Sequence, residues 1–358
     1  MRPHILFLLG LLTPLAFHPA RGQAPPVRLR FQVVTDPMVN NEEAFRLLVP
    51  RDWRSEGGIV WRPEISSLAW LQMRLSDPGG SAGLEFFPTP PFTWSMQGYP
   101  GFPPGSLYLG AYVVQPMEPE IFVRQIILPQ MRARVSALRV IRTEPLPRLA
   151  QEVAATVQEP GAVKQVSAAR TRVEYLEGGK QFEEDIYLVL VYARVPLTPQ
   201  YIFWGPDRAF GFRAEKGQLD RQAPLLDAML ASLRINRLWF AKVLQVREMW
   251  IRNQMQAIRN AGELSRYIAR TSDEISDMQQ QAWENRQASE ERTARAYTEY
   301  IRGVETYHDS YAGHDVQLPT GYGQVWASRD GEYILANDLH FNPNEGGRGT
   351  WTQITPVH

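Results

Sequence analysis

The sequence predicts an α+β fold with a mainly antiparallel sheet, followed by a helical hairpin connector and a small β-rich C-terminal module. Up to about residue 236, short runs of alternating apolar and polar side chains are mixed with helical patterns. From 238 to 302 there is no proline, and apolar residues recur in steps of three and four. From 303 to 358, short strand-like runs alternate with clusters of turn residues.

The first 22 residues have the pattern of a cleavable secretory signal. Arg2 supplies a positive charge, Ile5 to Phe17 is an apolar run, and the small residues Ala20 and Gly22 precede Gln23. The run is too short to span a membrane, which takes about 20 apolar residues. We therefore expect cleavage before Gln23, and a secreted or periplasmic protein with no membrane span after signal cleavage.

Residues 25–237 are predicted to form one α+β domain. Its expected strands are 27–33, 44–49, 68–75, 84–87, 107–114, 166–176 and 186–195. Its expected helices are 118–134, 149–159 and 221–233. Pro129 should end or kink the first helix, because proline removes a backbone donor and its ring clashes with the preceding turn.

Two parts of this domain resemble the PsbP/Mog1-like superfamily. A strand from Phe45 runs into Pro50 and is followed by Trp53, and a closing apolar helix, 225–233, leads into Ile235. The resemblance implies an α/β/α sandwich. It also implies a role in binding or assembly, because members of that superfamily are mostly assembly factors and binding modules.

Residues 238–302 are predicted to form a helical connector with a break near 271–274, where Thr271 or Ser272 can cap a second helix. Its heptad-like apolar stripe fits two interpretations. The helices pack as a hairpin on the protein itself, or they contact a protein partner or a second copy of the chain.

Residues 303–358 are predicted to form a small β-rich module with strands at 304–307, 316–318, 324–327, 333–335 and 350–354. With Tyr307, Trp326 and Trp351 among its aromatic residues, it is similar to a C-terminal module of uncharacterised secreted bacterial proteins. That resemblance implies no activity.

The composition excludes nucleic acid as a partner and disulfide bonds as a source of stability. The chain has 38 basic and 38 acidic residues, so it lacks the basic excess that nucleic-acid binding requires. It contains no cysteine, so its domains must be held together by core burial rather than by disulfides. No motif calls for a cofactor, and we expect none.

Two patterns could carry chemistry. Gly79 to Gly83 matches the G-x-S-x-G motif of hydrolases, but the strand expected directly after it, in place of a helix, favours an ordinary hairpin turn. After signal cleavage all four histidines lie in the C-terminal module, at 308, 314, 340 and 358. With the neighbouring aspartates, His308, His314 and His340 are candidate metal ligands or acid–base groups, and polar turn residues are the alternative.

The segment from Pro88 to Gly105 holds six prolines and four aromatic residues. Long loops of this kind are functional or disordered, and rigid aromatic side chains are good anchors for contacts. Trp94, Tyr99 and Phe102 are therefore candidate binding residues. The alternative is a lid that covers the core of the domain itself.

These observations favour an exported, non-enzymatic protein that acts in binding or envelope assembly. One alternative is a secreted hydrolase or metal-binding protein that uses the C-terminal histidines. Another is a periplasmic carrier of a small ligand, which would require an apolar cavity in the N-terminal domain.

Overall fold

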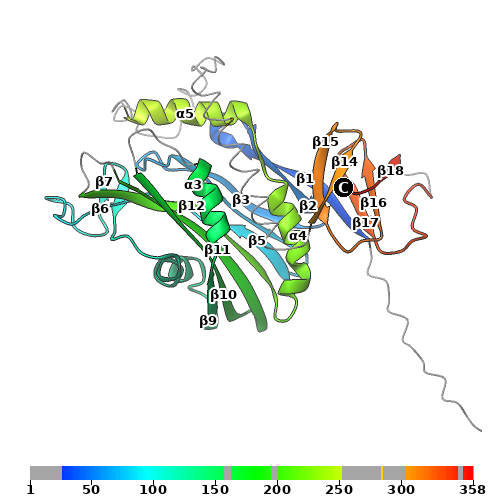
Figure 1. Ribbon diagram of the computed structural model, residues 1–358, viewed down its shortest axis with the longest axis horizontal. Coiled ribbons are helices and arrows are strands. Elements are labelled where there is room, and N and C mark those ends of the chain that lie inside the picture. Colours follow the sequence, from blue (N-terminus) through cyan, green and yellow to red (C-terminus); the bar gives the residue numbers. More distant parts are fainter. Residues whose placement is uncertain are drawn as a thin grey trace, which may run out of the picture.

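The computed structural model describes residues 26–156, 163–194, 200–251, 284, 304–345 and 350–357. The fold is mixed α+β and consists mostly of β-sheet (Figure 1). The predicted signal segment, 1–22, lies outside the described residues, as does the predicted connector beyond Ile251 apart from residue 284. No helix in the described ranges is long and apolar enough to pass through a membrane.

The largest sheet is antiparallel along its main path, which runs β3-β4-β5-β12-β11-β10-β9. The strands of this path are β3 (Arg54–Trp61), β4 (Ala69–Ser76), β5 (Ala82–Phe86), β12 (Tyr201–Glu215), β11 (Lys180–Arg194), β10 (Val163–Glu177) and β9 (Ser136–Pro145). The short strands β6 (Phe92–Ser95), β7 (Leu107–Tyr108) and β8 (Ala111–Val113) join at one end through β12.

The central strand β11 is buried on both faces, and its side chains alternate between two apolar cores. Tyr187 and Val189 face a core that includes residues of α3 (Pro147–Thr156) and α4 (Leu219–Ala231). Ile186, Leu188 and Leu190 face a second core that includes residues of α1 (Pro119–Phe122) and α2 (Leu128–Met131). Helices therefore cover both faces of the sheet.

Pro129 does not end the helix in which it lies. A π-helical turn, Val123–Ile127, connects α1 to α2, and Pro129 sits in the first turn of α2. The wider turn accommodates the proline ring and its missing N–H, as π-bulges do elsewhere. The expected single strand 107–114 is also wrong, because Leu109 and Gly110 have positive φ angles and form a two-residue turn between β7 and β8.

A buried ionic cluster attaches α2 to the sheet. The Arg132 guanidinium donates to Glu184 on β11 at 2.7 Å and to Glu85 on β5 at 2.8 Å. Both Arg132 and Glu184 are buried. Gly211 on β12 leaves room for Glu184, because a Cβ atom at Gly211 would clash with the Glu184 carboxylate.

A second sheet joins the two ends of the chain. Its order is β13-β2-β1-β17-β16-β18, and it is formed by β13 (Arg234–Ile235), β2 (Glu42–Pro50), β1 (Val27–Asp36), β17 (Tyr333–Ala336), β16 (Gln324–Ser328) and β18 (Trp351–Ile354). The hairpin of β14 (Val304–Asp309) and β15 (His314–Pro319) packs beside it. A short 3₁₀ turn, Pro37–Val39, follows β1.

Strand β1 belongs to both halves of this second sheet. Val27 to Leu29 pair with Tyr333 to Leu335, and the strand from Leu29 onward pairs with β2. Figure 1 shows β1 running from the larger body of the molecule into the group of C-terminal strands. The C-terminal core therefore includes Leu29 and Leu48 together with residues of β14 to β18.

We expect Leu29→Ala to lower the free energy of unfolding by roughly 2–5 kcal/mol, because Leu29 is fully buried in the core that β1 shares with the C-terminal strands. Urea unfolding followed by tryptophan fluorescence measures this. Leu339→Ala is the control, with an expected effect within about 0.5 kcal/mol, because Leu339 is 70% exposed. An equal effect of both substitutions would contradict the shared core.

Candidate functional site

The three candidate residues of the Pro/aromatic segment lie in and after β6, in different environments. Trp94 lies on β6, opposite Ile202 of β12, and is half-buried. Tyr99 is buried, and its hydroxyl lies 2.6 Å from the Thr93 hydroxyl. Phe102 is 39% exposed and pairs with Tyr99 across a short turn. The segment is therefore ordered and partly folded against its own domain.

The three histidine candidates are exposed on the C-terminal strands and turns. His308 Nδ1 lies 2.9 Å from an oxygen of Asp315 across the β14–β15 hairpin, and His314 follows on the same hairpin. His340 lies after β17. Within the described ranges no group of three or more His, Asp or Glu side chains is arranged to hold a metal ion. The histidine site stays a prediction.

The turn that matches G-x-S-x-G connects two strands. Asp77 accepts hydrogen bonds from the Ser81 hydroxyl at 2.9 Å and from the Ala82 amide at 2.6 Å. Ser81 is followed by β5 and not by a helix. The serine therefore has a role in closing the turn, and it is not held on the strand-to-helix elbow that a hydrolase nucleophile needs.

The strongest candidate site is a cavity of about 510 Å³ that the sequence did not reveal. It lies where the large sheet divides. Met73 of β4, Phe86 of β5 and Phe210 of β12 are in register, and β5 ends at Phe86. Beyond that point residues 87–91 follow the edge of β12 without forming a strand, and pairing with β12 resumes at β6. Residues 69–71 of β4 and 206–209 of β12 line the cavity there.

A β-bulge supplies the charged part of the wall. The pairing of β11 with β12 shifts where Val189 faces Arg208 and Leu190 faces Pro206, so that Asp207 is the extra residue. Asp207 and Arg208 form an ion pair of 3.0 Å, and both side chains are largely buried, at 14% and 11% exposed. Bulges redirect side chains out of the regular alternation, and here both neighbours line the cavity.

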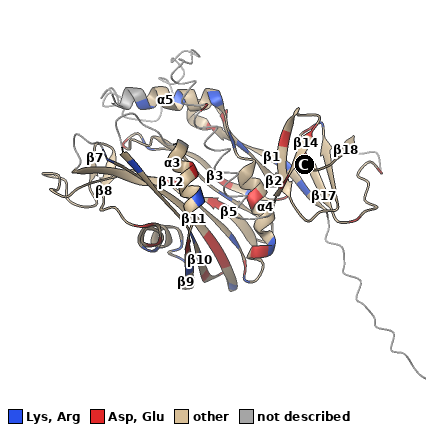
Figure 2. Cartoon of the chain, viewed as in Figure 1, with Lys and Arg blue, Asp and Glu red and all other residues tan. Residues whose placement is uncertain are grey.

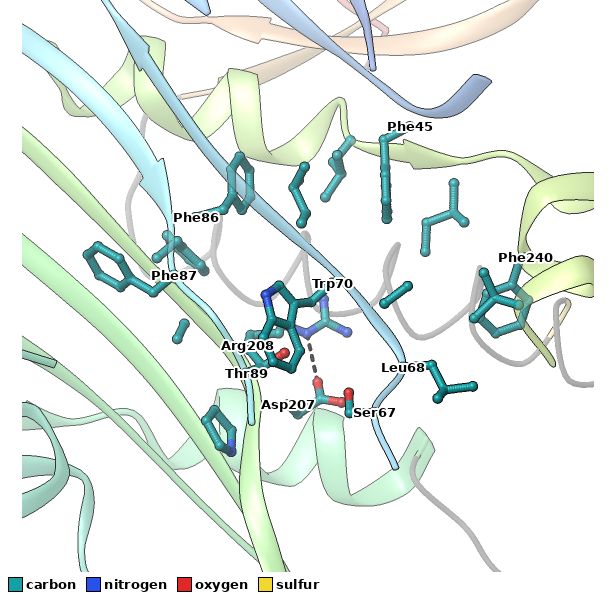
Figure 3. Close-up of a pocket in the computed structure, with 18 of the residues that line it drawn as sticks. Phe45, Ser67, Leu68, Trp70, Phe86, Phe87, Thr89, Asp207, Arg208 and Phe240 are labelled. Atoms are coloured by element: carbon teal, nitrogen blue, oxygen red, sulfur yellow. Dashed lines mark hydrogen bonds and ion pairs between the residues drawn. The ribbon is translucent and has the colours of Figure 1, made fainter. Parts of the chain in front are cut away.

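Four of the polar lining residues lie together on one side of the cavity, and a further charged lining residue, Arg247, belongs to the helix of residues 237–251. In Figure 3, Ser67, Thr89, Asp207 and Arg208 gather on one side of the Trp70 indole, and Phe45 and Phe240 lie away from them. The Trp70 indole nitrogen is buried and has no hydrogen-bond partner among the described residues. The cavity thus combines a polar side with a larger apolar side.

The apolar side is formed by β2, α4, β13 and the helix α5 (Arg237–Ile251). The aromatic rings of Phe45 and Trp239 lie 5.0 Å apart between their centroids. The remaining apolar lining residues on this side are Leu230, Leu233, Ile235, Phe240, Val243 and Leu244. Aromatic and aliphatic walls with a few polar groups are typical of small-molecule sites.

A single buried carboxylate fixes this side of the cavity. Asp36 at the end of β1 is fully buried and accepts hydrogen bonds from the indoles of Trp61, at 2.8 Å, and Trp239, at 2.7 Å. Asn236 caps α5 by accepting from the Leu238 amide at 2.9 Å. The two contacts determine where α5 begins and how its first turn is oriented over the cavity.

A second buried carboxyl lies one turn before Leu230 on α4. Asp227 is 2% exposed, and neither of its oxygens has a hydrogen-bond partner in the described part of the chain. Burial raises its pKa to about 8, although the charge of Arg170 opposes the shift and Asp185 adds to it. Asp227 is therefore mostly protonated at neutral pH.

No protein-family model matches this chain, and no curated protein matches it in sequence.

We expect Asp36→Ala to lower the free energy of unfolding by roughly 2–5 kcal/mol and to speed amide hydrogen exchange in α5, because two buried indole N–H groups lose their acceptor. Hydrogen exchange with mass spectrometry measures the second effect. Asp309→Ala is the matched control: Asp309 is equally buried and accepts from the Tyr333 hydroxyl, away from the cavity. Unchanged exchange in α5 of Asp36→Ala would refute the anchoring role.

The raised pKa of Asp227 predicts a pH-dependent stability. The folded state binds the proton more tightly than the unfolded state, so the free energy of unfolding should fall as the pH rises from about 4 to about 8. Asp227→Asn should remove this pH dependence, because asparagine does not titrate. Above pH 8 the free energy of unfolding of the variant should exceed that of the original chain by about 2–4 kcal/mol.

Urea unfolding at several pH values measures this difference, with Asp330→Asn at an exposed turn as the control. If Asp227→Asn and the original chain kept the same difference in stability at all pH values, Asp227 would not be the group responsible.

Proposed function

We propose that this protein is a non-enzymatic binding protein that carries a small apolar or amphipathic molecule in the cavity between β4, β12 and α5. The observation that carries the proposal is the cavity itself. Its volume of about 510 Å³ lies within the range of about 300–1,000 Å³ that is common for small-molecule sites. This proposal combines the binding protein and the small-ligand carrier expected from the sequence.

The chemical character of the lining residues favours an amphipathic ligand. Phe45, Trp239 and Phe240 offer an apolar surface for a hydrocarbon chain or ring. Asp207 and Arg208, beside Ser67 and Thr89, offer both donors and acceptors to a polar group. A ligand with one polar end would therefore satisfy both sides of the cavity.

Two further features support this reading. Helices on both faces of a largely antiparallel sheet fit the proposed PsbP/Mog1-like sandwich, a superfamily in which binding modules are common.

We also propose that the protein is exported, with residues 1–22 removed. A secreted or periplasmic carrier would meet apolar molecules in water, and enclosing them would keep them dispersed.

N-phenyl-1-naphthylamine, an uncharged fluorophore, is the probe for this proposal. We expect protein beginning at Gln23 to bind it saturably, with a rise in its fluorescence. Ala69→Phe on β4 and Val243→Phe on α5 should each weaken binding at least tenfold, because either phenyl group fills part of the cavity from a different wall.

Ala154→Phe on the exposed side of α3 is the matched control and should bind as the original chain does. Circular dichroism and the melting temperature establish that each variant is folded. If the original chain did not bind the fluorophore, or if both cavity-filling variants bound it with undiminished affinity, the cavity would not be the carrier site.

A further inference from the structure

A long stretch of the chain around β6, β7 and β8 carries no charge. Between Glu85 and Glu118 there is no aspartate, glutamate, lysine, arginine or histidine. Figure 2 shows β7 and β8 uncharged at the end of the large sheet that lies farthest from the C-terminal strands. Charged residues make up 21% of the whole sequence, so a surface-forming stretch of this length without any is a marked local departure.

The turns of this uncharged stretch expose large apolar side chains. Met96 is 87% exposed in the turn after β6, and Leu109 is 67% exposed in the turn between β7 and β8. Phe102 is 39% exposed, and Phe203 at the adjoining start of β12 is 44% exposed. We call these four residues the apolar tip. Large apolar side chains exposed in neighbouring turns are candidates for a contact site.

An aromatic stack holds the apolar tip in place. The rings of Tyr108 and Tyr99 lie 4.3 Å apart, and those of Tyr99 and Tyr201 lie 5.7 Å apart. Phe102 packs edge-on against Tyr108 at 5.0 Å. Leu109 follows Tyr108 in the chain, and Met96 follows Ser95, which pairs with Tyr201. The exposed side chains are therefore attached to a rigid base.

Leu109 occupies a backbone conformation that leucine disfavours. Its φ is +46° and that of Gly110 is +75°, as in the two-residue turns in which Asn-Gly is preferred. A leucine in this left-handed region strains the backbone, and such strain tends to be kept where it serves a function. Here it places an apolar side chain at the outermost point of a turn.

The area of the apolar tip distinguishes between possible partners. Its four exposed side chains present on the order of 400 Å², about half of the roughly 800 Å² that each partner buries in a stable protein–protein interface. They also project from separate turns, so a protein partner would need several matching hollows. A lipid bilayer needs no matching shape, and its interface favours tyrosine rings beside inserted apolar side chains.

We propose that the apolar tip inserts into the interface of a lipid bilayer and docks the protein on a membrane surface. Met96, Leu109 and Phe102 enter the apolar region, and the tyrosines of the stack lie at the level of the headgroups. Because the stretch has no charge, docking depends on apolar insertion and not on anionic headgroups. The proposal stands apart from the ligand cavity, since none of the four tip residues lines it.

Flotation with vesicles of uncharged phosphatidylcholine tests this proposal. We expect protein beginning at Gln23 to bind the vesicles with little dependence on salt. Leu109→Asn and Met96→Gln should each reduce partitioning about tenfold, because burial of one such side chain contributes at least that factor. Leu109→Asn should keep or raise the melting temperature, since asparagine tolerates the left-handed conformation.

Leu339→Asn is the matched control, because Leu339 is as exposed as Leu109 but lies among the C-terminal strands. It should bind vesicles as the original chain does, and both tip variants should keep naphthylamine binding. The proposal is overturned if the original chain does not float, or if the Leu339 variant loses as much binding as the tip variants. Light scattering that shows a dimer abolished by Leu109→Asn, without vesicle binding, would assign the tip to self-association instead.

Discussion

The hydrogen bonds that Asp36 accepts hold together the large sheet, the second sheet and α5, and the cavity depends on how these three meet. A carboxylate with no exposure to solvent is costly unless it is fully bonded, and two indole N–H groups and the Met38 amide supply its partners. Trp61 belongs to the large sheet, Trp239 to α5 and Asp36 to the strand that continues into the second sheet. One side chain thus determines how three elements meet.

The cavity follows from that arrangement together with the short length of β5. Between β5 and β6, residues 87–91 leave the regular strand pairing of the large sheet. The hydrogen bond from Trp239 to Asp36 holds α5 over this part of the sheet. The bulge at Asp207 bends β12 beside it. The backbone bond from the Ser66 amide to the Gly110 carbonyl, 2.9 Å long, ties one edge of the cavity to the uncharged turns.

Much of the fold was readable from periodicity, because its elements are regular wherever one face is buried. The C-terminal strands β14 to β18 lie within a few residues of their predicted positions, as do β1, β2, β4, β5 and the helices α3 and α4. Strand β12 was missed, because Gly205, Pro206 and Gly211 interrupt its alternation. Strand β9 was missed because its side chains are mostly exposed.

The cavity could not be predicted for a different reason. Its lining comes from residues that are far apart in the sequence, and nothing local distinguishes Trp70 or Phe45 from ordinary core residues. The sequence did mark the Pro/aromatic segment as unusual, and the structure adds which of its side chains are exposed. Tyr99 is buried in the stack, and Met96 and Leu109, which the sequence did not single out, are the most exposed apolar residues of that region.

The pairing of Val27–Leu29 with Tyr333–Leu335 also has a consequence for the order in which the molecule forms. The contact closes a loop of nearly the whole chain, so its entropic cost is among the largest in the fold. Long-range pairings of this kind slow folding. The C-terminal core cannot be completed until the last strands have been synthesised, whereas the two cores of the large sheet contain no residue of those strands.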